Sequence, residues 1–166
     1  MEQVKDIIKQ IHAQWKQAKA HLAERCALGG NKDMADKLAA CDMFTGGESL
    51  SDLAELFTSA QGIEFCLAAK FPTLATLRLF KRFGVERYGV YIDAGDITLD
   101  NPRRAVLIGR TTARVNYTDK SALHNLTLLR GASAVVNASG WAVVGLTSER
   151  GCKLIKNVTG NAVILC

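Results

Sequence analysis

The sequence contains no apolar run long enough to form a membrane-spanning helix, so we expect no membrane partner. Its charged first residues are not followed by the apolar segment of a secretory signal, and we expect no signal peptide. Neither a G-x-x-x-x-G-K phosphate loop nor a G-x-G-x-x-G motif after a strand is present. These absences weaken the case for a nucleotide-dependent enzyme, and we predict no cofactor.

The cysteines are few and poorly spaced for shared chemistry. Their number is odd and no two stand in a C-x-x-C arrangement, which argues against a disulfide framework and a zinc site. Cysteine is usually buried as a small apolar residue in a reducing compartment. We therefore predict a cytoplasmic protein with no metal site and five buried, unpaired thiols: Cys26, Cys41, Cys66, Cys152 and Cys166.

The chain has 166 residues, of which 48% are hydrophobic. A chain of this length buries roughly 70% of the surface that it exposes when unfolded. It can therefore form a core without disulfides, as one domain or as one domain with a small appendage.

The first half of the sequence has the apolar spacing of α-helices. Residues 2–27 predict one long helix, because apolar residues recur along it at alternating steps of four and three. This stripe either packs within its own domain, which we favour, or forms a seam between two copies; it consists of Val4, Ile8, Ile11, Trp15, Ala18 and Leu22. Further helices are expected from Asn31 to about Phe44, after a cap at Ser51, over 62–70 and over 74–82.

After Gly84 the pattern changes to the alternation of a β-strand. Residues 85–92 and 97–99 suit strands, and from Ala122 one phase of inward residues persists for at least 25 residues. Ordinary strands last only about five or six residues, so this persistence indicates a chain that turns corners while it coils. Arg130 and Lys156 fall in the inward phase, and we predict that they mark corners because a charge does not suit a dry core.

An internal repeat supports this interpretation. Residues 131–146 align without a gap on residues 151–166 at an offset of 20, and an earlier copy lies at 110–129. A fourth copy at 89–109 is weaker. The alternative is a β-meander whose hairpins have similar sequences.

The predicted fold class is therefore α+β, with a helical N-terminal region or cap over 1–84. It is followed over 85–166 by a short single-chain β-solenoid of about three to four coils, each of near 20 residues. A solenoid leaves unpaired backbone groups at both ends, and such edges invite association. The helical region is expected to cover the first end, and the uncapped apolar segment at 162–166 to be exposed or paired. We therefore expect a homo-oligomer or a protein partner.

Side chains able to carry chemistry are scarce, and we predict no catalytic residue. His12 and His21 stand nine positions apart, too far for a shared metal, and His124 lies in the inward phase. We favour a packed or hydrogen-bonded His124; the alternative is a catalytic base like that of left-handed β-helix acyltransferases. Turns favour aspartate for local hydrogen bonds, and we prefer that explanation to a calcium site for Asp93, Asp96 and Asp100.

Basic residues are concentrated between positions 71 and 115, where eight of them and four acidic residues give a local net charge of +4. Arginine suits phosphate groups, and aromatic residues lie between these positions. A nucleic-acid surface is therefore the alternative to an ordinary solvated face. The eight residues are Arg78, Lys81, Arg82, Arg87, Arg103, Arg104, Arg110 and Arg114.

Four segments carry a resemblance to other proteins: GIEFC from Gly62, KFPTLATLRLFK from Lys70, YGVYIDAG from Tyr88 and NASGWAVV from Asn137. They resemble an uncharacterised family of short proteins from gut Bacteroidales genomes, some of them associated with mobile elements. The resemblance covers about residues 53–166 and implies a bacterial cytoplasmic protein. It implies no catalytic residue, because that family has no known activity.

The function that we favour is a non-enzymatic module for protein interaction or self-assembly, because a solenoid is a rigid rod with a regular outer face. Large apolar side chains in the outward phase have to be covered by the helices or by a partner; they are Trp141, Val135, Val143 and Ile155. The alternatives are a nucleic-acid-binding accessory protein of a mobile element, through the basic residues, and an acyltransferase-like left-handed β-helix enzyme, through His124.

Overall fold

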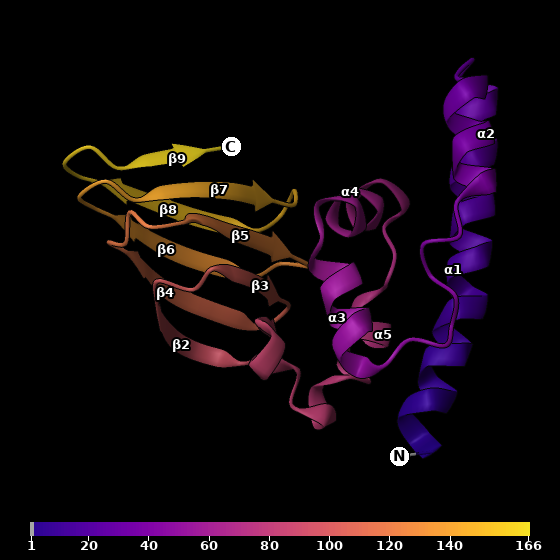
Figure 1. Cartoon of the computed structure of the whole chain (residues 1–166), viewed down its shortest axis with the longest axis horizontal. Helices are drawn as coiled ribbons and strands as arrows, with labels where there is room; N and C mark the ends of the chain where they lie inside the picture. Colours follow the sequence, from indigo (N-terminus) through magenta and orange to yellow (C-terminus); the bar gives the residue numbers. More distant parts are fainter. Residues whose placement is uncertain (1) are drawn as a thin grey trace. The chain divides into compact units, whose positions relative to one another are not determined.

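The fold is α+β, as the sequence predicts, and it consists of two compact units that divide between Leu79 and Phe80. The computed structural model describes residues 2–166, with side chains from Gln3 onward. The first unit carries the α-helices and the second carries a parallel β-solenoid (Figure 1). Across residues 2–166, none of the helices combines the length and the apolar character that a membrane crossing demands.

Four of the helices begin where the sequence supplies a capping side chain. Asn31 accepts a hydrogen bond from the backbone amide three residues later at 3.1 Å, and Ser49 forms a capping box with Asp52. Ser59 and Thr73 cap the next two helices in the same way. The five helices are α1 (Glu2–Leu28), α2 (Lys32–Ala40), α3 (Leu50–Thr58), α4 (Ala60–Ala69) and α5 (Leu74–Arg78).

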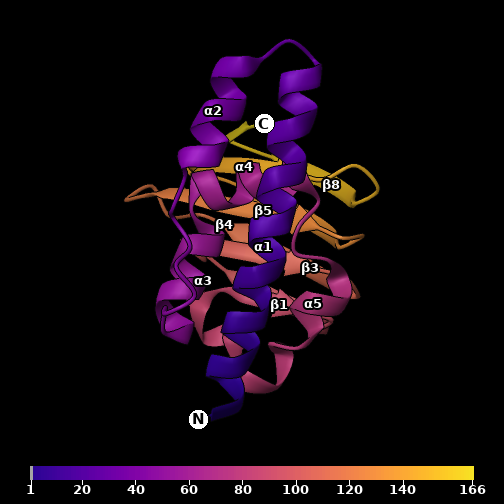
Figure 2. The same ribbon diagram turned by 90° about the vertical axis from the view of Figure 1, so that its right-hand side faces the viewer.

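The predicted apolar stripe on α1 packs inside the helical unit. α2 runs back along α1, as Figure 2 shows, and α4 contacts α1 as well. Trp15 is buried, and its ring centre lies 5.8 Å from that of Phe44 and 6.2 Å from that of Phe65. These contacts confirm that the stripe packs within its own domain.

Several expected boundaries are wrong for local reasons. α2 stops before Cys41 rather than near Phe44, because the backbone at Cys41 is extended. α3 is capped by Ser49 rather than by Ser51, because Ser49 completes the capping box. The last expected helix, 74–82, is interrupted after α5, and its end belongs to the 3₁₀ helix η1 (Lys81–Phe83).

The strand expected over 85–92 is shorter than predicted. Its first half is a second 3₁₀ helix, η2 (Val85–Tyr88), and only β1 (Val90–Ile92) is extended. Gly84 and Gly89 flank η2 with φ angles of 66° and 77°. Glycine adopts this left-handed conformation readily, so the chain turns tightly on both sides of η2.

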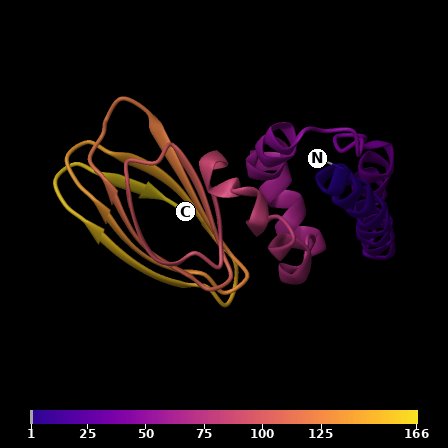
Figure 3. The ribbon, with the colours of Figure 1, turned by 90° about the horizontal axis from the view of Figure 1, so that it is seen from below.

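The second unit is built from two parallel sheets whose strands alternate along the chain. Their orders are β1-β3-β5-β7-β9 in the first sheet and β2-β4-β6-β8 in the second, which corresponds to about four coils. Figure 3 shows the chain winding as stacked loops. The other strands are β2 (Gly95–Asp100), β3 (Arg104–Ile108), β4 (Thr111–Tyr117), β5 (Leu123–Leu129), β6 (Ser133–Ala138), β7 (Val143–Ser148), β8 (Lys153–Val158) and β9 (Val163–Leu165).

The repeat in the sequence sets the register between the later coils. Ser133 pairs with Lys153 and Asn137 with Asn157, in parallel and at the same offset of 20 that aligns the two copies. The β-meander alternative is therefore wrong, because its neighbouring strands would be antiparallel. Inward residues of successive coils stack into one core, whose fully buried members include Leu107, Val115, Leu126, Val136 and Val144.

One of the two predicted corner residues lies at a corner. Arg130 has a φ of 55°. The Glu149 carboxylate of the next coil accepts a hydrogen bond from the Arg130 backbone amide at 2.6 Å and forms an ion pair with the Arg130 guanidinium. The prediction for Lys156 is wrong, because Lys156 lies within β8 in register with the inward Val136. β8 is an edge strand, so the inward side of its coil stays open enough for Lys156 to be exposed.

A row of polar side chains, which we call the amide ladder, follows the outer face of the second sheet. Asn116 donates a hydrogen bond to Asp100 at 2.8 Å, Asn137 donates to Asn116 at 2.9 Å, and Asn157 donates to Asn137 at 2.9 Å. These residues occupy the same register position in successive coils. The ladder therefore links all four strands of the second sheet.

Removing an amide from the middle of the ladder should destabilise the fold more than removing one from its end. N137A breaks two ladder bonds and N157A breaks one. We expect losses in the free energy of unfolding of about 1–3 kcal/mol for N137A and about half as much for N157A, at about 0.5–1.5 kcal/mol for each bond. Urea denaturation measures both losses, and equal values would contradict a stabilising ladder.

Candidate interaction surface

The structure places the four apolar residues expected on the outer face in two separate regions. Val135 and Ile155 pair in register on the second sheet, where Ile155 is exposed and Val135 is half-buried. Val143 begins β7 in the first sheet, and Trp141 lies in the turn that leads into it. The alternation in the sequence shows that these side chains point outward, but not that they belong to different sheets.

A larger apolar surface surrounds Trp141 on the first sheet. Leu123, Val143 and Val163 share one register position on β5, β7 and β9, so they form a row across three coils. Trp141 precedes this row in the turn, and Leu165 follows it two residues along β9. Trp141 is 64% exposed, and Leu123 and Leu165 are each 54% exposed. We call these five residues the apolar patch.

One member of the apolar patch, Leu123, is absent from the residues that the sequence singles out. Val163 and Leu165 lie in the apolar segment at 162–166 that the sequence predicts to be exposed or paired, and both are exposed. The repeat could have identified Leu123, because positions 123, 143 and 163 are about one repeat length apart and share the outward phase. The row exists only if the copies stack in parallel, since another strand order would separate the three positions.

Polar residues border the apolar patch. Ser121 and Asn161 lie one repeat length before and after Trp141, and Asn125 lies on the outer face of β5. Gly145 leaves room for the Asn125 amide, because a Cβ atom at Gly145 would lie 2.7 Å from Asn125 Oδ1. An apolar centre with a polar rim is the composition typical of protein–protein interfaces.

The eight basic residues of the predicted nucleic-acid surface are spread over both units. Arg78 belongs to α5 of the helical unit, and the other seven belong to the solenoid unit. Within the solenoid unit, Arg104 points outward from the first sheet, Arg114 points outward from the second, and Arg110 stands at the corner between them. The remaining four, which lie in η1 and η2 and just before β3, are Lys81, Arg82, Arg87 and Arg103.

His124 is enclosed in the solenoid core. Its side chain is 0% exposed, and its ring centre lies 4.9 Å from that of Tyr117. Its Nδ1 lies 3.1 Å from the carbonyl oxygen of Pro102, and its Nε2 lies 3.2 Å from that of Asp119. The packed, hydrogen-bonded state expected for His124 is therefore confirmed. A general base has to reach its substrate, and this geometry does not favour that role.

The three aspartates considered for calcium lie along β2 and the turn before it. Asp93 Oδ1 accepts a hydrogen bond from the Arg110 amide at 2.8 Å, and Asp100 accepts one from Asn116 in the amide ladder. Asp96 lies on the exposed face of β2. In the part of the chain that the structure describes, no three or more histidine, cysteine or carboxylate side chains gather as a metal site would require.

No family model, curated protein or solved structure matches this chain. The function therefore has to be inferred from the surface and the core of the molecule itself.

Tyr117 carries a buried hydroxyl that has no hydrogen-bond partner within the described residues. The residue is 0% exposed and stands in register with Ala138, whose small side chain leaves room for the ring. Burial raises the pKa of the Tyr117 phenol well above its usual value, because the phenolate would lose its hydration. A buried hydroxyl without a hydrogen-bond partner is expected to lower the stability of the fold.

Y117F should make the protein more stable. It removes only the unpartnered hydroxyl, so we expect the free energy of unfolding at neutral pH to rise by about 1–3 kcal/mol. The effect should grow in alkali. The unfolded tyrosine ionises near pH 10 whereas the folded one does not, so the wild type loses stability as the pH rises above about 10 and Y117F loses less. Urea denaturation of both proteins at neutral pH and above about pH 10 measures the two free energies of unfolding. A Y117F variant less stable than the wild type would contradict the prediction.

Proposed function

We propose that the chain is a non-enzymatic self-association module in which two copies join through the apolar patch. The observation that supports this is the Trp141 side chain, 64% exposed beside a row of aliphatic side chains. Apolar surface in water is unfavourable at about 25 cal/mol for each Å². Contiguous exposed apolar patches with a polar rim mark interaction sites.

Trp141 has the properties of an interface anchor. Tryptophan is enriched among the few residues that dominate binding energy, which lie near the centre of an interface. The strand beside it is held firmly, because Ala142 and Val144 are fully buried on the inner side of the same segment. A surface that is already ordered loses little conformational freedom on binding.

The chemistry of the apolar patch favours a second copy as the partner. None of its five residues carries a charge, so two patches can face each other across a two-fold axis without repulsion at the centre. Such an interface uses the same surface on both copies. This partner is the homo-oligomer that the sequence leads us to expect.

W141S should weaken self-association by at least about 30-fold, because losing a central anchor costs about 2 kcal/mol or more. Trp141 is exposed, so we expect the circular dichroism spectrum to stay unchanged, and the Tm to stay unchanged at concentrations low enough for both proteins to be monomeric. Sedimentation equilibrium over a range of concentrations measures the dissociation constant.

The matched control is I155S, which removes a comparably exposed apolar side chain from the second sheet. Its dissociation constant should equal that of the wild type. A wild-type chain that stays monomeric at high micromolar concentration would contradict the proposal. An I155S variant weakened as much as W141S would also contradict it.

We also propose a bacterial cytoplasmic setting, which the family resemblance implies. The five cysteines are free, which supports a reducing compartment. Only Cys66 among them is buried, so the expected burial is wrong for the other four. If the protein is cytoplasmic, all five thiols should react with an alkylating reagent when the protein is taken from acid-quenched cells. Mass spectrometry counts the alkylated cysteines. Protected thiols that react only after reduction would contradict it.

The alternatives have less support from the arrangement of residues. Nucleic-acid binding would use basic residues that are spread over α5, two 3₁₀ helices, the segment before β3, both sheets and a corner. Non-specific affinity for nucleic acid is greatest in low salt, so the absence of a mobility shift under those conditions would exclude that alternative. The acyltransferase alternative would need the enclosed His124 to reach a substrate, and acetyl-CoA turnover that H124Q abolishes would revive it.

A further inference from the structure

The second sheet ends in two edge strands of equal length. β2 and β8 are its outermost strands, and each has six residues. Every pairing in this sheet is parallel, and the two edge strands occupy the same register positions. Edge strands present unpaired backbone groups that can pair with another chain. A second copy can therefore continue the sheet in register by placing its β2 beside β8.

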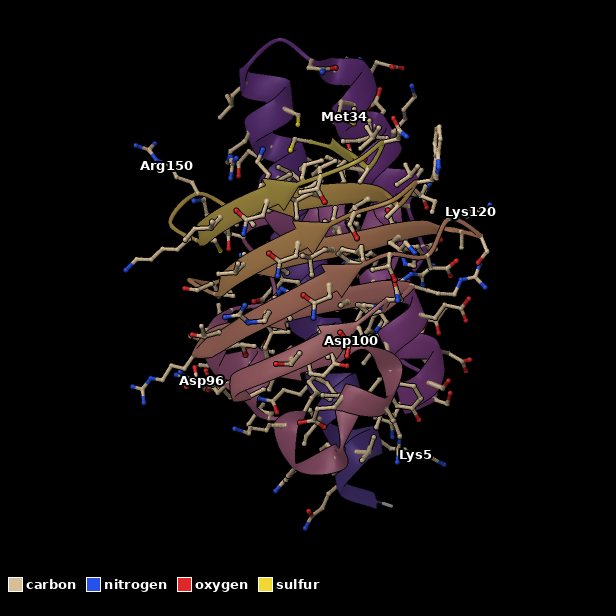
Figure 4. All side chains as sticks on the ribbon, turned by 90° about the vertical axis from the view of Figure 1, so that its left-hand side faces the viewer. Lys5, Met34, Asp96, Asp100, Lys120 and Arg150 are labelled. Atoms are coloured by element: carbon tan, nitrogen blue, oxygen red, sulfur yellow. The ribbon has the colours of Figure 1, made fainter. Side chains whose placement is uncertain are left out.

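The outer rows of the second sheet are compatible with such pairing. One row runs from Asp96 through Thr112 and Ser133 to Lys153. In the same register, Asp96 of a second copy would lie beside Lys153. Figure 4 shows Asp96 on β2, at the edge of the sheet. Opposite charges at directly neighbouring positions stabilise a strand pair.

The inner row opposes the same pairing. It runs from Leu99 through Val115 and Val136 to Lys156. The two valines are fully buried, whereas Lys156 is exposed and its Nζ lies 3.5 Å from Cys166 Sγ. A lysine can lay its aliphatic stem over apolar side chains while its ammonium stays in water.

A second copy stacked on β8 would exclude water from the Lys156 ammonium. Lys156 would then face Leu99 of the second copy, and the inward residues on either side of the junction would be apolar, namely Leu154 on β8 and Ile97 on β2. No carboxylate lies among these inward positions of β2 and β8 to pair with the ammonium. Burying an unpaired charge costs far more than a strand pairing or an outer Asp–Lys pair returns.

We propose that Lys156 is a gatekeeper that prevents β8 of one copy from pairing with β2 of another. Pairing between unlike edges does not close on itself, so its product is a growing filament rather than a dimer. An inward-pointing charge on an edge strand is one of the devices by which proteins avoid this outcome. The role is independent of the apolar patch, which lies on the first sheet.

K156V should convert the chain into a filament-forming protein. Valine repeats the residue one coil earlier, Val136, so we expect the variant to fold, with an unchanged circular dichroism spectrum and a Tm no lower than that of the wild type. In sedimentation velocity, its weight-average sedimentation coefficient should keep rising with concentration, while that of the wild type reaches a limit.

Four variants separate register-specific pairing from non-specific aggregation. K156R keeps the charge, and K153V removes only an outward lysine of the same strand; both should sediment like the wild type. Adding D96K to K156V should reverse the assembly, because it sets two lysines side by side at the junction, whereas adding W141S should leave it intact. The proposal is overturned if K156V sediments like the wild type, or if D96K leaves the K156V assembly unchanged.

Discussion

The solenoid unit depends on the parallel register between its coils, in which each residue stacks on its counterpart in the next coil. This register is held by backbone hydrogen bonds in two sheets and by a shared core of inward side chains. It brings like residues together, since a repeat places the same residue type at the same position. Whether a row stabilises the solenoid depends on how the side chains of that residue type interact when they stack on one another.

Asparagine gains from such stacking, because its amide both donates and accepts and so forms a continuous ladder from Asp100 to Asn157. Aliphatic residues gain too, inward as core and outward as the row of Leu123, Val143 and Val163. A charged residue does not gain. The solenoid accordingly has its inward lysine, Lys156, on the edge strand, where no further strand of the chain covers it.

These rows give the side and the end of the coil stack different chemistry. The side carries an uncharged apolar patch that suits a closed interface between two copies, whereas the end carries a charge that opposes open-ended stacking. Such a division would let a protein with an exposed sheet edge form a defined assembly and avoid fibres. The enclosed His124, with both ring nitrogens facing backbone carbonyls, belongs to the structural core of this arrangement.

The sequence by itself determined the α+β class, the long first helix and the later coils, because helix spacing, strand alternation and a 20-residue repeat are all local or near-local signals. It was less informative about the first coil, whose strands pair at an offset of 16, as in Val90 with Val106, and therefore do not follow the repeat. Only the tertiary structure decided which outward residues share a surface. Trp141 and Ile155 have the same phase in the sequence, yet a corner sends the chain from one sheet to the other between them, and contact depends on register across coils rather than on distance along the chain.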